Sequence, residues 1–351
     1  MRKLISRTGR LVAAVALAAG AIACQPAKVD ETGPRQVRVT AVTVPGTPWH
    51  DMWVRFSERA AEIAPDKLAV ELFVLAQFGP EKNMIANVRR NRVQIAGLSL
   101  QGAAQLVPEL NLLLAPFLFD SRKQIDYVLD EHLLDPYRAL LEDKGLTILQ
   151  WADVGWTNLY SRRPLTSPED FEGRRMRTSR AAGARVFGRV IGMNQIVLPF
   201  TDVVPALQTG LVDGGQSGLG MYALSGIARE APHLLLTAHA YDAGLVVANA
   251  EWWHGLEDEH RRLIRASLDD VDEHRRDVRH MLGNMMANLR ADDHTTVHEL
   301  TPKQRETWRA SSRGAIDILI QEIGGETAKL YERIRAGKAD FAELYPDKTP
   351  E

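Results

Sequence analysis

The spacing of apolar residues between positions 37 and 98 constrains the fold more than any other feature of the sequence. It switches between the alternation typical of strands and the longer repeat typical of helices. The pattern predicts strands at 37–43, 68–75 and 94–98, separated by helices at 49–64 and 80–90. Because a helix joins each strand to the next, we expect the strands to run parallel in one sheet with helices on its faces.

The rest of the chain continues this alternation and then becomes helical. An apolar run at 112–119 is expected to be buried, and residues 122–144 are expected to form a helix. Further strands are expected at 146–151, 174–178, 195–198 and 244–248, with helices that begin at 182, 203 and 258. Residues 258–336 are mostly helical and charged, and the charged run at 269–280 is interpreted as a solvated helix face. The sequence therefore predicts two α/β lobes with a helical C-terminal region packed around them.

The composition is that of an ordinary globular protein, with 45% hydrophobic and 25% charged residues among 351. The 43 basic and 45 acidic residues give a formal net charge of −2. Nucleic acid is not an expected partner, because no excess of positive charge is present to bind a phosphate backbone. The single cysteine excludes an internal disulfide framework and a multi-cysteine metal cluster.

The N-terminal segment predicts export. Residues 1–23 combine four basic residues with an apolar run at 11–23, which is too short to span a bilayer but suits a secretory signal. Ala21 to Cys24 resembles the lipobox of bacterial lipoproteins, so lipid attachment at Cys24 is expected, with 24–36 as a polar tether. Ordinary signal cleavage that leaves Cys24 as a free thiol is the alternative. Without residues 1–23 the chain has 39 basic and 45 acidic residues, a net charge of −6.

No complete catalytic signature is present in the sequence. The G-x-S-x-G pattern of a nucleophile elbow lacks its last glycine after both Ser99 and Ser217. The sequence has no H-E-x-x-H or glycine-rich phosphate-binding motif, and His274 and His280 are spaced wrongly to share a metal. We therefore expect no enzyme activity, no metal and no cofactor. An enzyme on this scaffold would need its nucleophile and base from among Ser99, Ser217 and His239.

Five segments resemble one known family in content and in order. They are QFGPEKNMIANVRRNRVQIA at 77–96, PELNLLLAPFLF at 108–119, RPLTSPEDFEGRRMR at 163–177, LPFTDVVPALQTGLVDG at 198–214 and LVVANAEWWHGLEDEHRRLI at 245–264. The chain thereby resembles the solute-binding subunits of tripartite ATP-independent periplasmic (TRAP) transporters over residues 37–335.

The resemblance implies a fold of two α/β lobes, joined by crossing strands and a long helix, that close over a ligand in the cleft. A first lobe is expected mainly within 37–151 and a second mainly within 152–248. A helical region at 249–351 is expected to pack on both lobes and to cross between them.

The signature contact of the family is an arginine whose guanidinium holds the ligand carboxylate with two parallel hydrogen bonds. The GRRMRTS motif places this arginine at Arg177. The alternative is a surface arginine, because Arg174, Arg175 and Arg180 are close by. Since Arg175 and Arg177 share one face of the expected strand, alternation alone does not choose between them.

Several pocket positions depart from the family pattern. Thr157 stands where many members carry a second basic residue, and Ser99 stands where some carry a glutamate. Ser217 replaces the asparagine of the D-G-x-x-N-P motif, with Gln216 before it. The resemblance therefore implies a pocket with one strong anion contact and few other charged groups.

Aromatic residues are expected to complete the pocket. Phe200 matches a pocket aromatic of the family, Trp156 stands beside Thr157, and Trp49 is a candidate from the opposite lobe. The alternative for Trp156 is a core position, because strand alternation can turn it away from the cleft. An apolar wall with one arginine suits a monocarboxylate with a hydrophobic or aromatic body better than a polar sugar acid.

The function implied by the resemblance is capture of a small organic acid and its delivery to a sodium-coupled permease in the membrane. We expect the protein in the periplasm, anchored by a lipid on Cys24. The alternatives are a sensory or other ligand-binding lipoprotein without a transporter, and a ligand that has no carboxylate.

Overall fold

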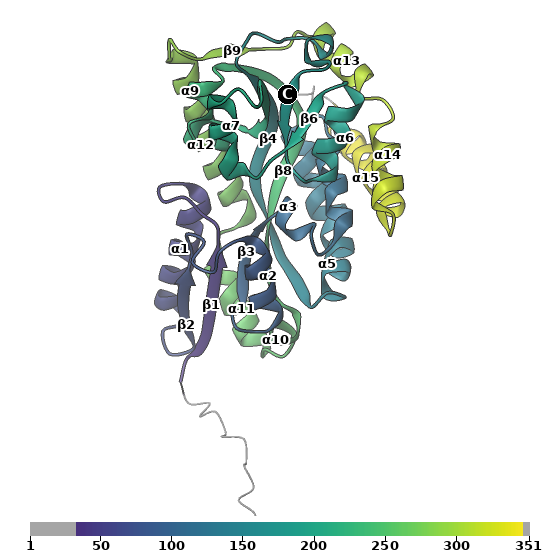
Figure 1. The fold of residues 1–351 in the computed structure, drawn as a ribbon. Coiled ribbons are helices and arrows are strands. Elements are labelled where there is room, and N and C mark those ends of the chain that lie inside the picture. Colours follow the sequence, from purple (N-terminus) through teal and green to yellow (C-terminus); the bar gives the residue numbers. More distant parts are fainter. Residues whose placement is uncertain (1–32, 347–351) are drawn as a thin grey trace, which may run out of the picture. The chain divides into compact units, whose positions relative to one another are not determined.

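The computed structural model of the chain describes residues 33–346, and the helices and strands below lie in that range. The expected signal segment at 1–23 and Cys24 lie outside the described residues. Within 33–346, nine strands form one mixed sheet in the order β2-β1-β3-β8-β4-β7-β5-β6, with β9 beside β8. Figure 1 shows the two ends of this order as two lobes, which β4 and β8 connect. The expected α/β class and two-lobed architecture are confirmed.

The first lobe is built from the five elements that the apolar spacing predicts. They are β1 (Arg35–Ala41), α1 (Pro48–Ile63), β2 (Leu68–Phe73), α2 (Glu81–Arg89) and β3 (Ile95–Ser99). Strand β1 pairs in parallel with both β2 and β3, as the helical connections predict. Trp53 and Phe56 on the buried face of α1 share one hydrophobic cluster with Val39 of β1.

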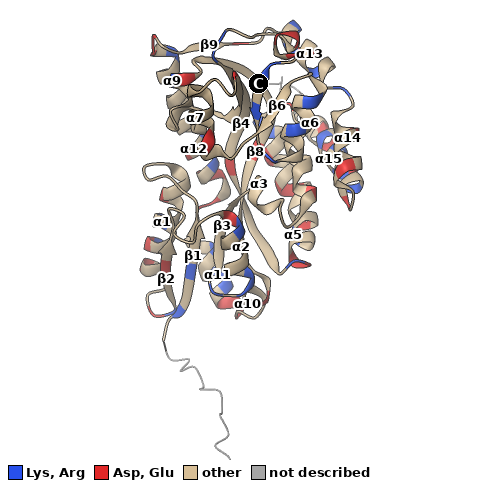
Figure 2. Ribbon diagram, in the orientation of Figure 1, with Lys and Arg blue, Asp and Glu red and all other residues tan. Residues whose placement is uncertain are grey.

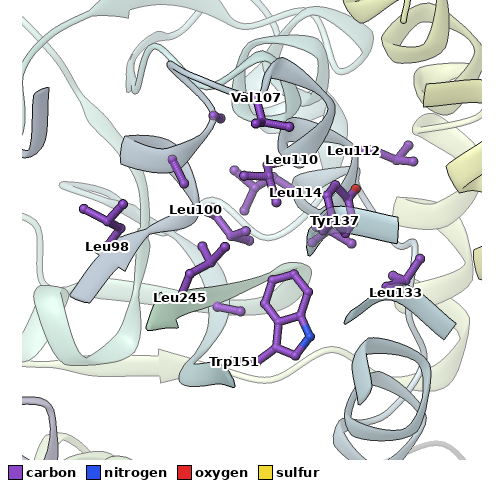
Figure 3. Close-up of a cluster of buried hydrophobic side chains, with 14 of the residues drawn as sticks. Leu98, Leu100, Val107, Leu110, Leu112, Leu114, Leu133, Tyr137, Trp151 and Leu245 are labelled. Carbon is purple, nitrogen blue, oxygen red and sulfur yellow. The ribbon is translucent and has the colours of Figure 1, made fainter. Parts of the chain in front are cut away.

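The chain between β3 and β4 contributes much of the largest hydrophobic cluster. Its helices are α3 (Leu100–Ala103), the 3₁₀ helix η1 (Pro108–Leu114), α4 (Arg122–Tyr127), the π-helix η2 (Val128–Leu133) and α5 (Leu134–Glu142). The helix expected at 122–144 is present but contains a π-helical turn. Figure 3 shows leucines of this cluster around Tyr137 and Trp151, whose rings meet edge to face with centroids 5.9 Å apart. The expected burial of 112–119 is confirmed.

Strands β4 (Leu146–Ser161) and β8 (His233–Asn249) are much longer than the sequence predicts. They pair antiparallel along their length, from Leu146 opposite Asn249 to Ser161 opposite His233. At one end β8 also pairs with β3, and at the other end β4 also pairs with β7, so the two strands join the lobes. The apolar runs recognised in the sequence cover only one end of each strand.

The second lobe is built around β5, which lies between β6 and β7 and pairs in parallel with both. Its elements are η3 (Pro168–Phe171), β5 (Arg175–Thr178), α6 (Ala182–Val190), β6 (Asn194–Val197), η4 (Phe200–Asp202), α7 (Val203–Gln208), β7 (Gly214–Gly218), α8 (Leu219–Leu224) and α9 (Ile227–Glu230). The sequence does not predict β7, because GGQSG has no apolar or β-branched residue. A side chain at Gly214 or Gly215 would collide with Tyr160 of β4, so these glycines allow the strands to pair.

The C-terminal region is mostly helical. It consists of α10 (Ala250–His254), α11 (Asp258–Ser267), α12 (Val271–Ala291), β9 (Thr296–His298), α13 (Pro302–Ser311), α14 (Ala315–Ile323) and α15 (Thr327–Leu344). Helix α12 packs against α1 of the first lobe and against α8 of the second. Figure 2 shows acidic and basic residues interspersed over the helices of both lobes. Among residues 33–346, no helix has both the length and the apolar character that a membrane span requires.

The charged run at 269–280 is a solvated face only in part, because Asp270, Asp272, Arg276 and His280 are exposed and other charged residues of the run are not. Asp269 and Arg275 are buried. Arg275 pairs with Asp130 of η2 at 2.6 Å, and Asp269 pairs with Arg59 of α1 at 3.1 Å. Burial is tolerated here because each charge finds an opposite charge on an element far away in the sequence.

Candidate functional site

One continuous cleft lies between the lobes, beside β4 and β8. Its first part is a cavity of about 360 Å³ that contains Arg177 and Phe200, and its second part is a cavity of about 280 Å³ that contains Trp49 and Trp53. We call these parts the Arg177 cavity and the Trp49 cavity. The residues that line both parts make the cleft continuous, and they are Val42, Ser99, Val154, Met221 and Asp242.

The cleft brings together most of the residues that the sequence singles out. Those that line the Arg177 cavity are Ser99, Thr157, Arg177, Phe200, Gln216 and Ser217. Trp49 lines the second cavity. Trp156 lines neither cavity, because its ring packs edge-on against Tyr241, with centroids 4.9 Å apart, at the margin of the largest hydrophobic cluster. The core position is thus where the structure places Trp156.

Arg177 lies near the carboxyl end of β5, paired between Ile196 of β6 and Gly215 of β7. Only 7% of its surface is exposed. Arg175, two residues earlier, is about half exposed at its side chain and lies 3.8 Å from Asp213, outside the cleft. The structure therefore distinguishes Arg177, which lines the cleft, from Arg175, which does not. Strand alternation alone could not make this distinction.

The guanidinium of Arg177 is oriented by the backbone. Its Nε and Nη2 donate to the carbonyl oxygen of Leu198 at 3.2 and 3.0 Å, and its Cζ lies 5.9 Å from the centroid of the Phe200 ring. Burial lowers the pKa of Arg177, and Tyr160 acts in the opposite direction. No carboxylate among residues 33–346 pairs with Arg177, and no described residue accepts from Nη1. A buried cation without a counterion is unfavourable, so this site is suited to an anionic ligand.

Gln216 is held by groups within the protein. Its Nε2 donates to Thr178 Oγ1 at 3.1 Å and to the carbonyl oxygen of Ala184 at 3.0 Å. Because Oε1 of an amide only accepts, Nε2 of His239 is the donor in their 3.1 Å bond. Nδ1 of His239 is then the acceptor for the Thr237 hydroxyl at 2.8 Å.

His239 is a neutral, structural histidine. Burial lowers its pKa to about 3, and its ring stacks on Phe187 with centroids 3.9 Å apart. Its ring nitrogens bond to Thr237 and Gln216, so neither Ser99 nor Ser217 has His239 as a base. Ser217 and Thr157 line the Arg177 cavity, and their hydroxyls make no hydrogen bond to any described residue.

Ser99 holds a carboxylate in the cleft. Its amide donates to Glu81 Oε1 at 2.6 Å, and its hydroxyl donates to Glu81 Oε2 at 2.8 Å. The same hydroxyl accepts from the amide of Gly102 at 2.9 Å and caps α3. Burial raises the pKa of Glu81, and the two bonds from Ser99 lower it. Sequence reasoning missed Glu81, although it begins α2 within one of the family-like segments.

Asp242 is the second carboxylate of the cleft. It lies on β8 opposite Gly155 of β4 and lines both cavities. Its Oδ1 is out of contact with solvent and has no hydrogen-bond partner among the described residues. Burial and then the charge of Glu81 raise the pKa of Asp242 to about 7, against a lowering by the amide of Ala243. The signal that sequence reasoning overlooked is the one acidic residue of β8, which stands three residues before the apolar run at 245–248.

The Arg177 cavity is thus lined by one cation, Arg177, and by two carboxylates, Glu81 and Asp242, the second of which also lines the Trp49 cavity. Arg177 is the one arginine or lysine among the described residues that line the two cavities, but the carboxylates of Glu81 and Asp242 are additional charges that the sequence does not indicate. Within residues 33–346, no three His, Cys, Asp or Glu side chains are grouped so that they could hold a metal ion.

Comparison with known proteins supports one family. The model of the bacterial extracellular solute-binding proteins of family 7 matches residues 39–322. The 2,3-diketo-L-gulonate-binding periplasmic protein YiaO of Escherichia coli is 29% identical over 223 residues, which are 63% of this chain and 68% of that protein. The C4-dicarboxylate-binding periplasmic protein DctP of Rhodobacter capsulatus is 26% identical over 312 residues, 88% of this chain and 92% of that protein. The sugar acid binding protein of Advenella mimigardefordensis, solved with galactonate, has a TM-score of 0.78 at 25% identity and covers 88% of this chain and 100% of that chain.

Proposed function

Because the chain belongs to family 7 of the bacterial extracellular solute-binding proteins, the solute-binding subunits of TRAP transporters, we propose that it captures a small organic acid in the interlobe cleft. The observation that carries the proposal is Arg177, a buried guanidinium that lacks a counterion in residues 33–346. Its bonds to Leu198 leave Nη1 and one N–H of Nη2 for a carboxylate.

The body of the solute is apolar or aromatic. Support comes from the Trp49 cavity, whose walls include Trp49, Met52, Trp53 and Met221. Aromatic and thioether side chains favour an apolar ligand because they gain free energy when water leaves their surface. The named relatives bind organic acids of several kinds, a C4-dicarboxylate, a diketo sugar acid and galactonate. The apolar walls here favour a monocarboxylate.

The solute is passed to a sodium-coupled permease, and the protein acts in the periplasm, held at the membrane by a lipid on Cys24. The first lobe lies mainly within 37–151 and the second mainly within 152–248. The lobes close on the solute, and the permease distinguishes the closed form. The support is family membership together with the basic and apolar N-terminal segment. Metabolic labelling with a fatty-acid analogue tests the anchor, since Cys24→Ser should abolish the label.

The solute class is tested by thermal-shift screening of carboxylic acids, followed by calorimetry of the best one. Arg177→Ala should weaken its binding by about 2–5 kcal/mol, because one partner of a desolvated charge pair is lost. Arg175→Ala is the matched control on the same strand and should leave the affinity unchanged. Equal affinities of wild type and Arg177→Ala would overturn the proposal.

A further inference from the structure

We propose that a second pocket, on the second lobe and apart from the cleft, binds a multiply charged anion of the phosphate class. The pocket has a volume of about 390 Å³, within the range of small-molecule sites, and four arginines dominate its lining. We call it the arginine pocket, and its lining residues are Arg162, Arg163, Leu165, Arg174, Arg175 and Asp213. None of them lines the Arg177 cavity or the Trp49 cavity, so the inference goes beyond the proposed function and does not depend on it.

The first observation is that strand pairing gathers these residues at one end of the second lobe's strands. Strand β7 pairs antiparallel with β4 and parallel with β5, so the end of β4 lies beside the starts of β5 and β7. Residues 162–163 follow β4, residues 174–175 stand at the start of β5, and Asp213 directly precedes β7. The cleft residues Arg177 and Ser217 lie further along β5 and β7, toward the other end of the same strands.

The second observation is that hydrogen bonds fix the backbone of the arginine pocket. The amide of Arg162 donates to the carbonyl oxygen of Asp213 at 2.9 Å, and the amide of Asp213 donates to the carbonyl oxygen of Arg175 at 2.7 Å. The hydroxyl of Ser161 donates to the carbonyl oxygen of Arg163 at 2.6 Å. Three of the four arginines are thereby held at the backbone, so a ligand has to order only their side chains, which lowers the entropic cost of binding.

The third observation is that the four arginines are exposed and have few partners. The side chains of Arg162 and Arg163 make no hydrogen bond or ion pair with any residue of 33–346. Arg175 lies 3.8 Å from Asp213, and Arg174 donates to a backbone carbonyl oxygen at 3.4 Å. The lining therefore combines four positive charges with one negative charge. The chain from residue 24 onward has a net charge of −6, so a basic composition does not account for this cluster.

The chemistry of the lining selects the class of anion. Like charges gathered in one pocket repel one another, and an anion with two or more charges offsets this repulsion better than a single carboxylate does. A phosphate group carries about −1.5 to −2 charge at pH 7 and has three acceptor oxygens, so it can accept from several guanidinium groups at once. Leu165 is the one apolar residue among the described residues of the lining, and it is buried, so the walls offer little to an apolar ligand body. The arginine pocket therefore suits a phosphate, either free or on a head group.

The test measures the binding of inorganic pyrophosphate to the full-length protein by calorimetry at constant ionic strength. Tricarballylate, which carries its charges on carboxylates, and acetate are the comparison anions. We expect pyrophosphate to bind about tenfold or more tighter than either, the scale of one additional hydrogen bond between charged groups.

Substitution then locates the binding in the protein. The double variant Arg162→Ala and Arg163→Ala should weaken pyrophosphate binding about tenfold or more. Its unfolding temperature without ligand should stay that of wild type, because neither side chain has a partner in residues 33–346. The double variant Arg90→Ala and Arg92→Ala is the matched control. It removes the same charge from exposed positions of the first lobe and should leave the affinity unchanged.

A second measurement distinguishes a free phosphate from one on a lipid head group. Sedimentation with vesicles of phosphatidylglycerol and phosphatidylcholine is compared with sedimentation with vesicles of phosphatidylcholine alone, for wild type and for the Arg162 and Arg163 double variant. The N-terminal segment is the same in both proteins, so a difference between them reports on the arginine pocket. Pyrophosphate binding that the double variant loses assigns a free phosphate. Loss of vesicle binding in the double variant, without pyrophosphate binding by wild type, assigns a head group.

The remaining outcomes overturn the inference. Absence of binding to both probes, or equal binding by wild type and the double variant, would mean that these arginines hold no phosphate. Loss of pyrophosphate binding in Arg177→Ala would place the anion in the cleft. Tricarballylate that binds as tightly as pyrophosphate would mean that charge alone attracts the ligand. Binding of polyglutamate without binding of phosphate would assign the pocket to an acidic segment of another protein. The proposed function is tested separately, by the affinity of Arg177→Ala for carboxylic acids, and it stands in each of these cases.

Discussion

The carbonyl oxygen of Leu198 accepts hydrogen bonds from both Nε and Nη2 of Arg177, at 3.2 and 3.0 Å. Nε and Nη2 lie along one edge of the planar guanidinium. The other edge, formed by Nη1 and the second N–H of Nη2, is left for a ligand. Leu198 directly follows β6, which pairs with the strand that carries Arg177. Strand pairing therefore sets the orientation of the arginine before a solute enters.

Replacement of Arg177 by lysine separates the effect of charge from that of geometry. Lysine keeps the charge but cannot bond to Leu198 and offer two parallel donors at once. We expect Arg177→Lys to weaken solute binding by about 1–3 kcal/mol, with little change in the unfolding temperature of the ligand-free protein. Calorimetry and thermal unfolding measure the two effects. Wild-type affinity in this variant would mean that the charge alone holds the solute.

The contact between Trp49 of α1 and Gly220 of α8 links the two lobes at the cleft. A Cβ at position 220 would lie 2.7 Å from the Trp49 ring. We expect Gly220→Ala to displace the ring and weaken solute binding by about 1–3 kcal/mol. Gly283→Ala on α12 is the control, because a Cβ there meets nothing within 4 Å. Calorimetry measures the affinity of both variants for the solute. Equal affinities of Gly220→Ala and Gly283→Ala would contradict the predicted effect of the Trp49 ring on binding.

Asp242 should make the ligand-free protein less stable at higher pH. Burial and the charge of Glu81 raise its pKa in the folded state to about 7, while an unfolded aspartate has a pKa of about 3.9. Between these values the folded protein keeps a proton that the unfolded chain releases, so stability is lost as the pH rises from about 4 to about 7.

The Asp242→Asn variant removes this titration. Without ligand, we expect it to unfold at a higher temperature than wild type at about pH 8 and at a similar temperature near pH 4. Thermal unfolding at the two pH values measures the difference. A variant that is less stable than wild type at the higher pH would contradict the assignment of the raised pKa to Asp242.

Arg279 joins α12 to both β4 and α4. Its Nε donates to Asp153 of β4 at 2.8 Å, and its Nη1 donates to Asp126 of α4 at 2.8 Å. Because Asp153 is buried, Arg279→Met leaves its charge without a counterion, and we expect a loss of about 3–5 kcal/mol in the free energy of unfolding. Urea titration measures this loss.

The matched control is Arg335→Met, which breaks the exposed pair of Arg335 with Glu332 on α15. Exposed pairs of this kind contribute about 0–1 kcal/mol. A similar loss in the free energy of unfolding of the two variants would show that the ion pairs of Arg279 stabilise the protein no more than an exposed pair does.

The sequence predicts the elements whose side chains carry a clear period. The strands and helices from β1 to β3 are predictable because their apolar residues alternate or repeat, and Arg177 is indicated by a motif. Strand β7 is not predictable from the sequence, because its glycines have no side chains whose polarity could alternate. The burial of Asp269 and Arg275 in the charged run at 269–280 is not predictable from the sequence, because their counterions, Arg59 and Asp130, lie on elements far away in the chain.

The acidic part of the cleft could not be predicted for a related reason. Glu81 begins a helix and Asp242 lies in a strand 161 residues later, and nothing in the sequence links the two positions. They become neighbours only because β3 pairs with β8 and Ser99, at the end of β3, holds Glu81. Such a site follows from strand pairing, which the spacing of residues does not reveal.

Strands β4 and β8 have a mechanical consequence for the molecule. They connect the lobes as a hydrogen-bonded ribbon, so a change in the width of the cleft is taken up by flexure of that ribbon. The ladder is irregular between residues 148 and 150, 153 and 155, and 157 and 159 of β4. Bending at such places breaks few hydrogen bonds, and Gly155, with φ +111°, lies at the middle one beside Asp242. The paired strands can therefore bend at this irregular position, and Asp242, which lies there opposite Gly155, lines both cavities of the cleft.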